Sequence, residues 1–558
     1  MTIIKTSLLA AAAAVLAASH GAEAQPVPAF GGQLQQIPPA PRPDNAAPQL
    51  EVARPEAATG TLPGGESMVV TALRVTGHTL FPEADLVAAA GFQPGAKANL
   101  ADLRQMAAGI ASFYNRRGYF VAQAYLPAQN IENGVVTIAV IEGRYGKIDL
   151  RNQTNLSDGL ARNLLHGLDT GAPVANRPLQ RRLLLLSDLP GVTVRSTLVP
   201  GAAVGDSDLI VEVLPGRRFT GSVEADNAGN RYTGAGRIGA TINLNNPTGH
   251  GDVASVRVLS SLDGLNYARA SYQRQFGALT AGIAYAHIDY RLGREFKPLR
   301  ASGSAGVASL YVAYPLIRSQ NANLQILAGA DAKTFKDELG VPPGSARRKT
   351  LALHAGLSGD ARDGFGGGGR TFYAANWTHG DLDLKTPAVR AADALTARTQ
   401  GGYDKLELSA ARIQTVTGAL SLYGAARGQV ASGNLDISEK MELGGAYGVR
   451  AYPEGEAYGD QGYILTLEAR LLLSDGWIKL PGEVQLFAFA DAGAVTIAKS
   501  PWFAGPNTAR RSGAGVGAAW ATDNGFVLKA TYAHRLGVRA TSGPSAPGRG
   551  WIQVAKLF

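Results

Sequence analysis

Apolar and polar side chains alternate along most of the chain from residue 219 onward. In the stretch GFVLKATYAHR (525–535), every second residue from 526 to 532 is apolar, while Lys529 and Thr531 fall on the opposite face. The stretch YILTLEARLLL (463–473) alternates in the same way. A period of two is typical of β-strands whose two faces meet different surroundings.

Alternation occurs both in soluble β-sandwiches and in membrane β-barrels, so the number and length of the strands must distinguish these two architectures. About sixteen alternating segments of roughly nine to twelve residues follow one another, the length that a tilted strand needs to cross a bilayer. Short turns and long loops also alternate, as in membrane barrels; the turns include 245–252, 276–278, 416–418 and 522–524, and the loops include 380–400 and 432–460. The pattern predicts that residues 217–558 form a transmembrane β-barrel of about 16 antiparallel strands.

The chain closes on WIQVAKLF (551–558), whose terminal Phe558 shares a face with Ile552 and Val554. This ending resembles the C-terminal signal that barrel-assembly machinery recognises. Lys556 interrupts the apolar face, but a lysine near the membrane interface can extend its ammonium group to water. We therefore expect outer-membrane lipids, periplasmic chaperones and the assembly machinery among the partners of this chain.

The region before the barrel shows the period of an α-helix. In residues 99–118 the apolar side chains recur three or four positions apart, Asn99 is placed to cap a helix and Gly118 to end it. This helix is the second of two in a segment whose order is β-α-α-β-β. The same order recurs in the following segment of about 75 residues. We expect two small α+β domains, at 68–145 and 146–216.

The first 67 residues have a different character. Residues 1–24 combine Lys5, a short apolar run and a small-residue triplet, which predicts a signal peptide cleaved after Ala24. Residues 25–67 hold nine prolines, which predicts an arm or linker without a long helix, although a short helix around FGGQLQQI (30–37) fits the sequence.

Composition excludes several classes of function. The chain has no cysteine, which excludes disulfides and thiolate metal sites. The net charge of +9 is spread over single cations rather than clustered with aromatic residues, so no nucleic-acid partner is expected. Neither G-x-S-x-G nor H-E-x-x-H occurs, which argues against an enzyme of those classes, and no cofactor or metal is implied.

One loop stands out by its composition, GGAYGVRAYPEGEAYGDQGY (444–463), which is rich in glycine and holds one arginine. The pair of sequences VRAY (449–452) and FADAG (489–493), behind two repeats that resemble POTRA domains, is similar to the TpsB transporters of two-partner secretion, the FhaC/ShlB/HecB branch of the BamA superfamily. The resemblance covers about residues 68–558. It implies that the loop at about 432–460 folds into the barrel lumen, and that its arginine pairs with the aspartate of an F-x-D motif on strand thirteen.

The residues that carry this expectation are on two segments; they are Val449, Arg450, Tyr452, Phe489 and Asp491. Alternation along EVQLFAFADAG (483–493) turns Asp491 toward the lumen, and the planar guanidinium of an arginine can hold a carboxylate through two parallel hydrogen bonds. Glycines permit the tight reversals of an inward-folding loop; they are Gly444, Gly445, Gly448 and Gly455. The family glycine after the arginine is Ala451 here, which predicts local strain if that position has a positive φ.

The resemblance implies an outer-membrane transporter that recognises an unfolded TpsA-like exoprotein, of the adhesin or haemolysin type, in the periplasm and passes it to the cell surface. Exposed edge strands suit an extended client chain, and the candidate edges are residues 192–198 and 122–126. The alternative is an insertion factor for outer-membrane proteins of the BamA or TamA kind, although two repeats rather than three or five favour secretion. A passive porin or an outer-membrane enzyme is a third alternative. The two domains before the barrel argue against a porin, and the missing catalytic motifs argue against an enzyme.

Overall fold

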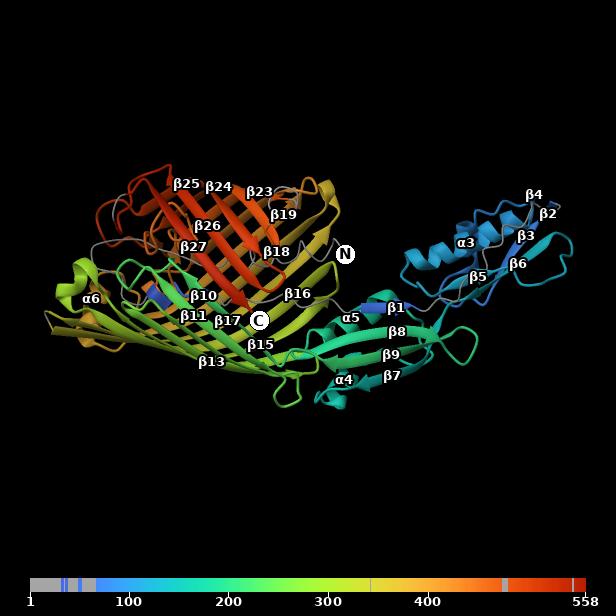
Figure 1. Ribbon diagram of the computed structural model, residues 1–558, viewed down its shortest axis with the longest axis horizontal. Helices are drawn as coiled ribbons and strands as arrows, with labels where there is room; N and C mark the ends of the chain where they lie inside the picture. Colours follow the sequence, from blue (N-terminus) through green and yellow to red (C-terminus); the bar gives the residue numbers. More distant parts are fainter. Residues whose placement is uncertain are drawn as a thin grey trace. The chain divides into compact units, whose positions relative to one another are not determined.

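The computed structural model describes residues 32–34, 36–38, 49–52, 67–341, 343–473, 480–543 and 546–558 (Figure 1). The expected signal peptide, residues 1–24, lies outside the described residues. The chain divides into two compact units, one of residues 46–216 and one that joins residues 217–558 with the chain before residue 46.

The larger unit is a closed barrel of sixteen strands, each hydrogen-bonded to its neighbours in chain order. The strands are β10 (Phe219–Asp226), β11 (Arg237–Asn245), β12 (Val253–Ser260), β13 (Leu265–Phe276), β14 (Leu279–Arg291), β15 (Ser302–Arg318), β16 (Ala322–Gly340), β17 (Pro343–Asp363), β18 (Gly369–Leu384), β19 (Gly401–Thr415), β20 (Leu420–Ala431), β23 (Gln461–Leu473), β24 (Glu483–Thr496), β25 (Thr508–Ala521), β26 (Phe526–Arg535) and β27 (Gly548–Leu557). The predicted barrel of about 16 strands is confirmed.

Short elements lie in the connections between the barrel strands. They are η2 (Arg294–Leu299), η3 (Phe365–Gly367), α6 (Pro387–Leu395), η4 (Ile437–Glu439), β21 (Met441–Glu442) and β22 (Tyr458–Gly459). No helix among the described residues is long and apolar enough to cross a membrane.

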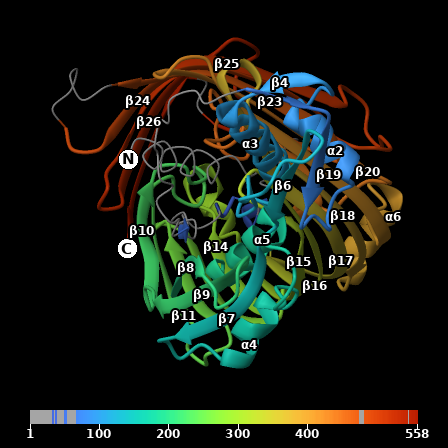
Figure 2. The ribbon, with the colours of Figure 1, turned by 90° about the vertical axis from the view of Figure 1, so that its right-hand side faces the viewer.

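The barrel closes where the first strand, β10, pairs with the last, β27 (Figure 1), and the C-terminus is marked beside β10 in Figure 2. This seam pairs five residues of each strand, fewer than the eight pairs between β10 and β11. Along the barrel strands, lumen-facing and outward-facing residues alternate; Glu468 and Arg470 on β23, for example, are buried, whereas Leu467 and Leu471 are exposed. The alternation read from the sequence therefore separates a polar interior from an apolar outer face.

The smaller unit begins with an α+β domain. Its elements are β2 (Met68–Val70), β3 (Ala72–Thr76), α2 (Glu83–Ala90), β4 (Ala96–Ala98), α3 (Leu100–Arg116), β5 (Gln123–Tyr125) and β6 (Val135–Ile141). Three strands form a sheet in the order β3-β6-β5, which leaves β5 at an edge. Asn99 caps α3 in a capping box with Asp102, and Leu103, Ala107 and Ile110 pack into the core as the sequence pattern predicted.

The second α+β domain contains β7 (Arg144–Asn152), α4 (Asp158–Leu165), α5 (Asn176–Ser187), β8 (Val192–Pro200) and β9 (Asp206–Pro215). Its order is β-α-α-β-β, the order of the first domain without the short strands β2 and β4. Its sheet has the order β1-β8-β9-β7, in which β1 (Gln49–Val52) comes from the proline-rich arm. The candidate edge at residues 192–198 is therefore partly covered by a strand that the sequence did not predict.

A buried carboxylate at the end of the first domain joins three segments of chain. Glu142 accepts hydrogen bonds from the backbone N–H groups of Thr79 (2.7 Å) and Leu80 (2.8 Å) and from the hydroxyl of Tyr114 (2.9 Å). Burial by itself would raise the pKa of Glu142, but these hydrogen bonds stabilise the carboxylate and lower its pKa below the usual 4.5. The ionised form thus ties the turn after β3 to helix α3.

Candidate functional site

The connection between β20 and β23, the eleventh and twelfth barrel strands, folds back into the lumen. We call residues 432–460 the lumen loop; it contains η4, β21 and β22. Its central side chains are fully enclosed, with Val449 and Tyr452 each 0% exposed and Arg450 5% exposed. A loop on an outer surface would leave such residues in water, so this segment is a packed part of the barrel interior.

Arg450 and Asp491 are in direct contact. The guanidinium of Arg450 donates from Nε to Oδ2 of Asp491 (2.8 Å) and from Nη2 to Oδ1 (2.8 Å), and the backbone N–H of Arg450 donates to Oδ2 (3.2 Å). Thr466 on β23 donates a further hydrogen bond to Oδ1 of Asp491. Asp491, on the thirteenth strand β24, is 2% exposed. The two side chains that the resemblance singled out thus form a buried, bidentate ion pair.

A second carboxylate, which the sequence analysis did not single out, binds the same arginine. Nη1 of Arg450 donates to Oε1 of Glu468 on β23 (2.7 Å), and Arg470 pairs with the other oxygen of Glu468 (2.6 Å). In the strand register Glu468 lies opposite Phe489. The alternation of β23 already turned Glu468 toward the lumen, and this inward carboxylate on the neighbouring strand was the signal that could have identified it.

Aromatic residues enclose this ion cluster. The guanidinium carbon of Arg450 lies 3.5 Å from the centre of the Phe489 ring, a cation–π contact, and the indole N–H of Trp551 donates to the carbonyl of Arg450 (2.7 Å). The hydroxyl of Tyr452 donates to the carbonyl of Val538, in the loop between β26 and β27 (2.8 Å). Phe489 and Trp551 therefore contact the charge and the backbone of Arg450, and Tyr452 attaches the next part of the lumen loop to the connection between β26 and β27.

Glycines allow the loop to turn within this space. Gly445 and Gly455 have φ of 89° and 77°, a conformation that other residues rarely adopt. Gly444 and Gly448 have ordinary φ values, but a side chain at either would meet backbone carbonyl oxygens at 2.2 Å. All four predicted glycines are thus required by conformation or by close packing.

Ala451 occupies the position where the family pattern has glycine. It has no positive φ, so the strain anticipated from the sequence is absent. The methyl group of Ala451 instead lies against Gly513 of β25, where an added side-chain carbon would come within 2.4 Å of it. The methyl group of Ala451 fits here because residue 513 is a glycine and has no side chain.

Further ion pairs attach the lumen loop to the rest of the wall. Glu439 is 1% exposed in its side chain and binds Lys333 on β16 (2.7 Å) and Lys405 on β19 (3.3 Å). Glu456 binds Arg511 on β25 (2.9 Å) and accepts a hydrogen bond from the backbone N–H of Ser542 (3.0 Å). Together with the Arg450 cluster, these contacts hold the loop to strands on several sides of the lumen.

The proline-rich arm also enters the barrel. Arg237 on β11 donates to the carbonyl of Gln36 (2.7 Å), and Arg257 on β12 donates to the carbonyl of Pro38 (2.5 Å). A short 3₁₀ helix, η1 (Gly32–Leu34), precedes these residues, in the place where a short helix was expected. Gln36 is only 4% exposed, so this part of the arm is enclosed within the barrel. Proline opposes a helix but leaves carbonyl groups unpaired, and the two arginines satisfy them.

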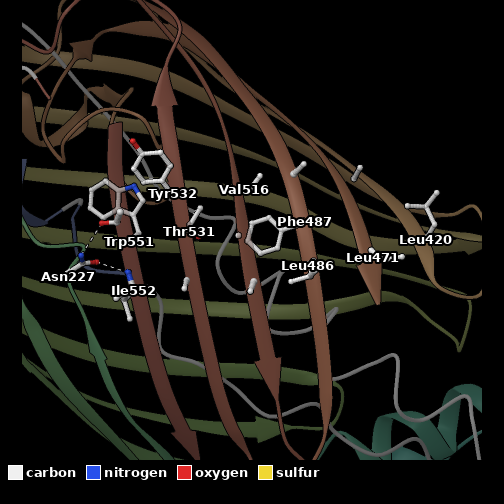
Figure 3. Close-up of a pocket in the computed structure, with 16 residues that line it drawn as sticks. Asn227, Leu420, Leu471, Leu486, Phe487, Val516, Thr531, Tyr532, Trp551 and Ile552 are labelled. Atoms are coloured by element: carbon white, nitrogen blue, oxygen red, sulfur yellow. Dashed lines mark hydrogen bonds between the residues drawn. The ribbon is translucent and has the colours of Figure 1, made fainter. Parts of the chain in front are cut away.

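An apolar hollow of about 960 Å³ lies on the last strands of the barrel, from β20 to β27 (Figure 3). Small residues, among them Ala488 and Gly517, leave this space. At one end of it the side chain of Asn227 accepts from the N–H of Ile552 (2.8 Å) and donates to the carbonyl of Gly550 (3.0 Å), which extends the seam between β10 and β27 (Figure 3). The residues that line the hollow are uncharged, and one of them, Trp551, also donates to the carbonyl of Arg450.

Within the described ranges, no group of three or more histidine, aspartate or glutamate side chains is arranged to hold a metal ion. Several charged groups of the lumen instead form ion pairs, as in the contacts of Arg450, Glu439 and Glu456. This arrangement suits a structural closure of the lumen.

Comparisons with known proteins agree with this architecture. Residues 205–519 match the family described as haemolysin secretion/activation protein ShlB/FhaC/HecB, and residues 68–143 match the POTRA domain of the ShlB type. The heme/hemopexin transporter protein HuxB of Haemophilus influenzae is 29% identical over 381 residues, which span 67% of this chain and 66% of that protein, just under two thirds of its length. The outer membrane transporter CdiB of Dickeya dadantii is 25% identical over 446 residues, 77% of this chain and 76% of that protein.

Solved structures show the same fold. CdiB from Escherichia coli superposes with a TM-score of 0.69 at 22% identity, over 90% of this chain and 93% of that one. BamA from Haemophilus ducreyi, without its POTRA domains 1–3, gives a TM-score of 0.53 at 14% identity, over 88% of this chain and 100% of that one. The barrel, the POTRA domain and the outer-membrane relatives place this protein in the outer membrane, with its POTRA region in the periplasm. The chain belongs to the ShlB/FhaC/HecB family of two-partner secretion transporters.

Proposed function

We propose that this protein receives an unfolded exoprotein of the adhesin or haemolysin type in the periplasm and conducts it through the barrel to the cell surface. In this proposal the POTRA region is the receptor and the barrel lumen is the conduit. The lumen loop closes the conduit at rest, and the Arg450 cluster holds the loop in place.

The observation that carries the proposal is the buried ion pair between Arg450 and Asp491, with Glu468 as its third member. A charged loop residue held by strand carboxylates keeps a large loop inside the barrel. Such a contact can be exchanged for water when the loop moves, because each of the charged groups is readily hydrated. A wall-to-loop closure of this kind suits a channel that opens for a large client and closes after it.

The receptor role rests on the edges of the POTRA sheets. Strand β5 lies at the edge of its sheet, and Tyr125 on it is 46% exposed. An edge strand offers unpaired N–H and C=O groups to an extended chain, and it recognises the backbone rather than one sequence. An unfolded exoprotein presents such a backbone along its whole length.

Deletion of residues 147–214, the second α+β domain, tests the proposal. Cells that produce the variant together with the exoprotein that the wild-type protein releases should release none of it, while the barrel still inserts. Barrel insertion is measured by the heat-modifiable migration of the variant in membrane extracts. Normal release of the exoprotein by the deletion variant would overturn the receptor role.

The same cells separate secretion from the alternative of outer-membrane protein insertion. If the protein transports one client, loss of its activity should leave the other outer-membrane proteins at wild-type levels. A general fall in outer-membrane proteins, with exoprotein release preserved, would instead support an insertion factor. Quantitative mass spectrometry of the outer membrane distinguishes the two outcomes.

A further inference from the structure

A strand of the chain's own arm occupies the edge of the second POTRA-like sheet. Strand β1 (Gln49–Val52) pairs in parallel with β8, with Gln49 opposite Arg195 and Val52 opposite Leu198. On its other side β8 pairs with β9 along its entire length. The edge that would otherwise accept an extended client is therefore filled by a segment from elsewhere in the same polypeptide.

This pairing is short. Strand β8 has nine residues, and β1 covers only the four from Arg195 to Leu198. The backbone of β8 from Val192 to Val194, and again at Val199 and Pro200, extends beyond β1 on this edge. A longer strand would pair with more of β8, and an antiparallel strand would be held slightly more strongly for each residue than a parallel one. The resident strand is therefore replaceable by a client segment of ordinary strand length.

The side chains of β8 alternate between the core and the solvent. Val194, Ser196 and Leu198 are buried, whereas Thr193 and Arg195 are exposed. The core-facing side chains already pack within the domain, so an added strand meets β8 mainly through its backbone groups. Recognition at this edge therefore tolerates many client sequences, which fits an unfolded polypeptide as the partner.

The arm that supplies β1 is attached at a second place. Residues 36–38 of the same arm are bound in the barrel lumen by Arg237 and Arg257. Displacement of β1 thus still leaves the arm attached in the lumen through residues 36–38.

We propose that β1 is a placeholder strand that guards the β8 edge, and that an extended segment of the exoprotein displaces it at the start of secretion. This inference rests on the proposed function. It adds the docking site, the β8 edge, and the chemistry of the partner, a backbone in extended conformation. It also adds a regulatory step, since the site is free only when β1 has left.

The absence of cysteine from the chain permits a clean test by disulfide cross-linking. Neighbouring strands lie about 4.8 Å apart, within the Cα separation of about 4.4–6.8 Å that a disulfide spans. The variant Gln49→Cys/Arg195→Cys joins two residues that are opposite each other in the register. The variant Glu51→Cys/Thr197→Cys repeats the test two residues further along the same face. The single-cysteine variants are the matched controls.

Secretion of the exoprotein is measured for each variant before and after reduction. We expect both pairs to cross-link in the periplasm, the oxidised forms to secrete at least about tenfold less, and reduction to restore secretion, while the single-cysteine controls behave as the wild type. Failure of both pairs to cross-link, or equal secretion by the oxidised and reduced forms, would overturn the placeholder strand. If the wild-type protein itself released no exoprotein, the proposed function would fail, and the inference with it.

Discussion

Removal of Arg450 is expected to release the lumen loop. Its guanidinium and backbone N–H make three hydrogen bonds to Asp491 and one to Glu468, all of them buried. Breaking a buried ion pair by removing one member costs about 3–5 kcal/mol, whereas an exposed pair contributes about 0–1 kcal/mol. Because Asp491 is 2% exposed, we apply the larger range to Arg450→Ala.

The two partners of Arg450 make the effects of substitution unequal. In Arg450→Ala, Asp491 keeps the hydrogen bonds from Thr466 and from the backbone N–H of residue 450, but this buried carboxylate loses its counter-charge. In Asp491→Ala, Arg450 keeps Glu468 and its contact with Phe489. We therefore expect a loss of about 3–5 kcal/mol for the first change and of about 1–3 kcal/mol for the second. The double variant should be little worse than Arg450→Ala, because both changes remove one shared contact.

The assay is the resting conductance of the purified barrel in planar lipid bilayers. A change of about 1.4 kcal/mol is tenfold in an equilibrium constant, so a loss of 3 kcal/mol shifts the balance between docked and released loop by about 150-fold. Exoprotein secretion, measured in cells for the same variants, should fall in the same order. Arg450→Lys keeps the charge but loses the planar fork, and it should lie between the wild type and Arg450→Ala.

The control is Arg510→Ala, which removes an arginine from the exposed face of β25 and should leave the conductance unchanged. The amount of folded barrel in the membrane must be equal among the variants. A resting conductance of Arg450→Ala equal to that of the wild type would refute the reasoning. Strictly additive effects of the two single substitutions would refute it as well, since residues in one contact cannot act independently.

Two further changes follow from contacts seen in the structure. Gly513→Ala should release the loop and raise the resting conductance, because the new methyl group would collide with Ala451. Combination with Ala451→Gly should lower the conductance again in part. A double variant with the same conductance as Gly513→Ala would contradict the contact between residues 451 and 513. The pKa of Glu142 is lowered in the folded state, so its ionised form stabilises the first POTRA domain above about pH 4.5 and this contribution is lost as the pH falls through the lower folded pKa. Unfolding in urea can be monitored by the protease resistance of residues 68–143. At pH 7, Glu142→Gln should be less stable than the wild type by about 1–3 kcal/mol, and this difference should vanish in acid. A difference that is unchanged at low pH would contradict this role of the carboxylate.

The architecture of the protein was accessible from the sequence because it depends on local periodicity. A strand with two different faces must alternate, and the alternation from residue 219 onward was enough to predict a barrel of about 16 strands. The capped helix α3 was recognisable for the same reason, since Asn99 and the apolar spacing act within one segment. The inward direction of Asp491 also follows from the alternation of its own strand.

The contacts between distant segments needed the tertiary structure. Glu468 faces inward by its own pattern, but its place beside Arg450 is set by the register of β23 against β24 and by the path of the loop. Ala451 was expected to cause strain, and only the fold shows that it packs against Gly513, more than sixty residues later in the chain.

The contacts of the proline-rich arm could not be predicted from the local pattern of side chains. Arg237 and Arg257 bind backbone carbonyl groups of residues 36–38, and β1 is held by backbone pairing with the edge of β8. Every residue has a carbonyl group and almost every residue has an N–H group, so such binding leaves no mark in the order of side chains. Side-chain periodicity determined which segments become strands and helices, whereas the partners of exposed backbone were decided by the three-dimensional positions of the edges and arginines.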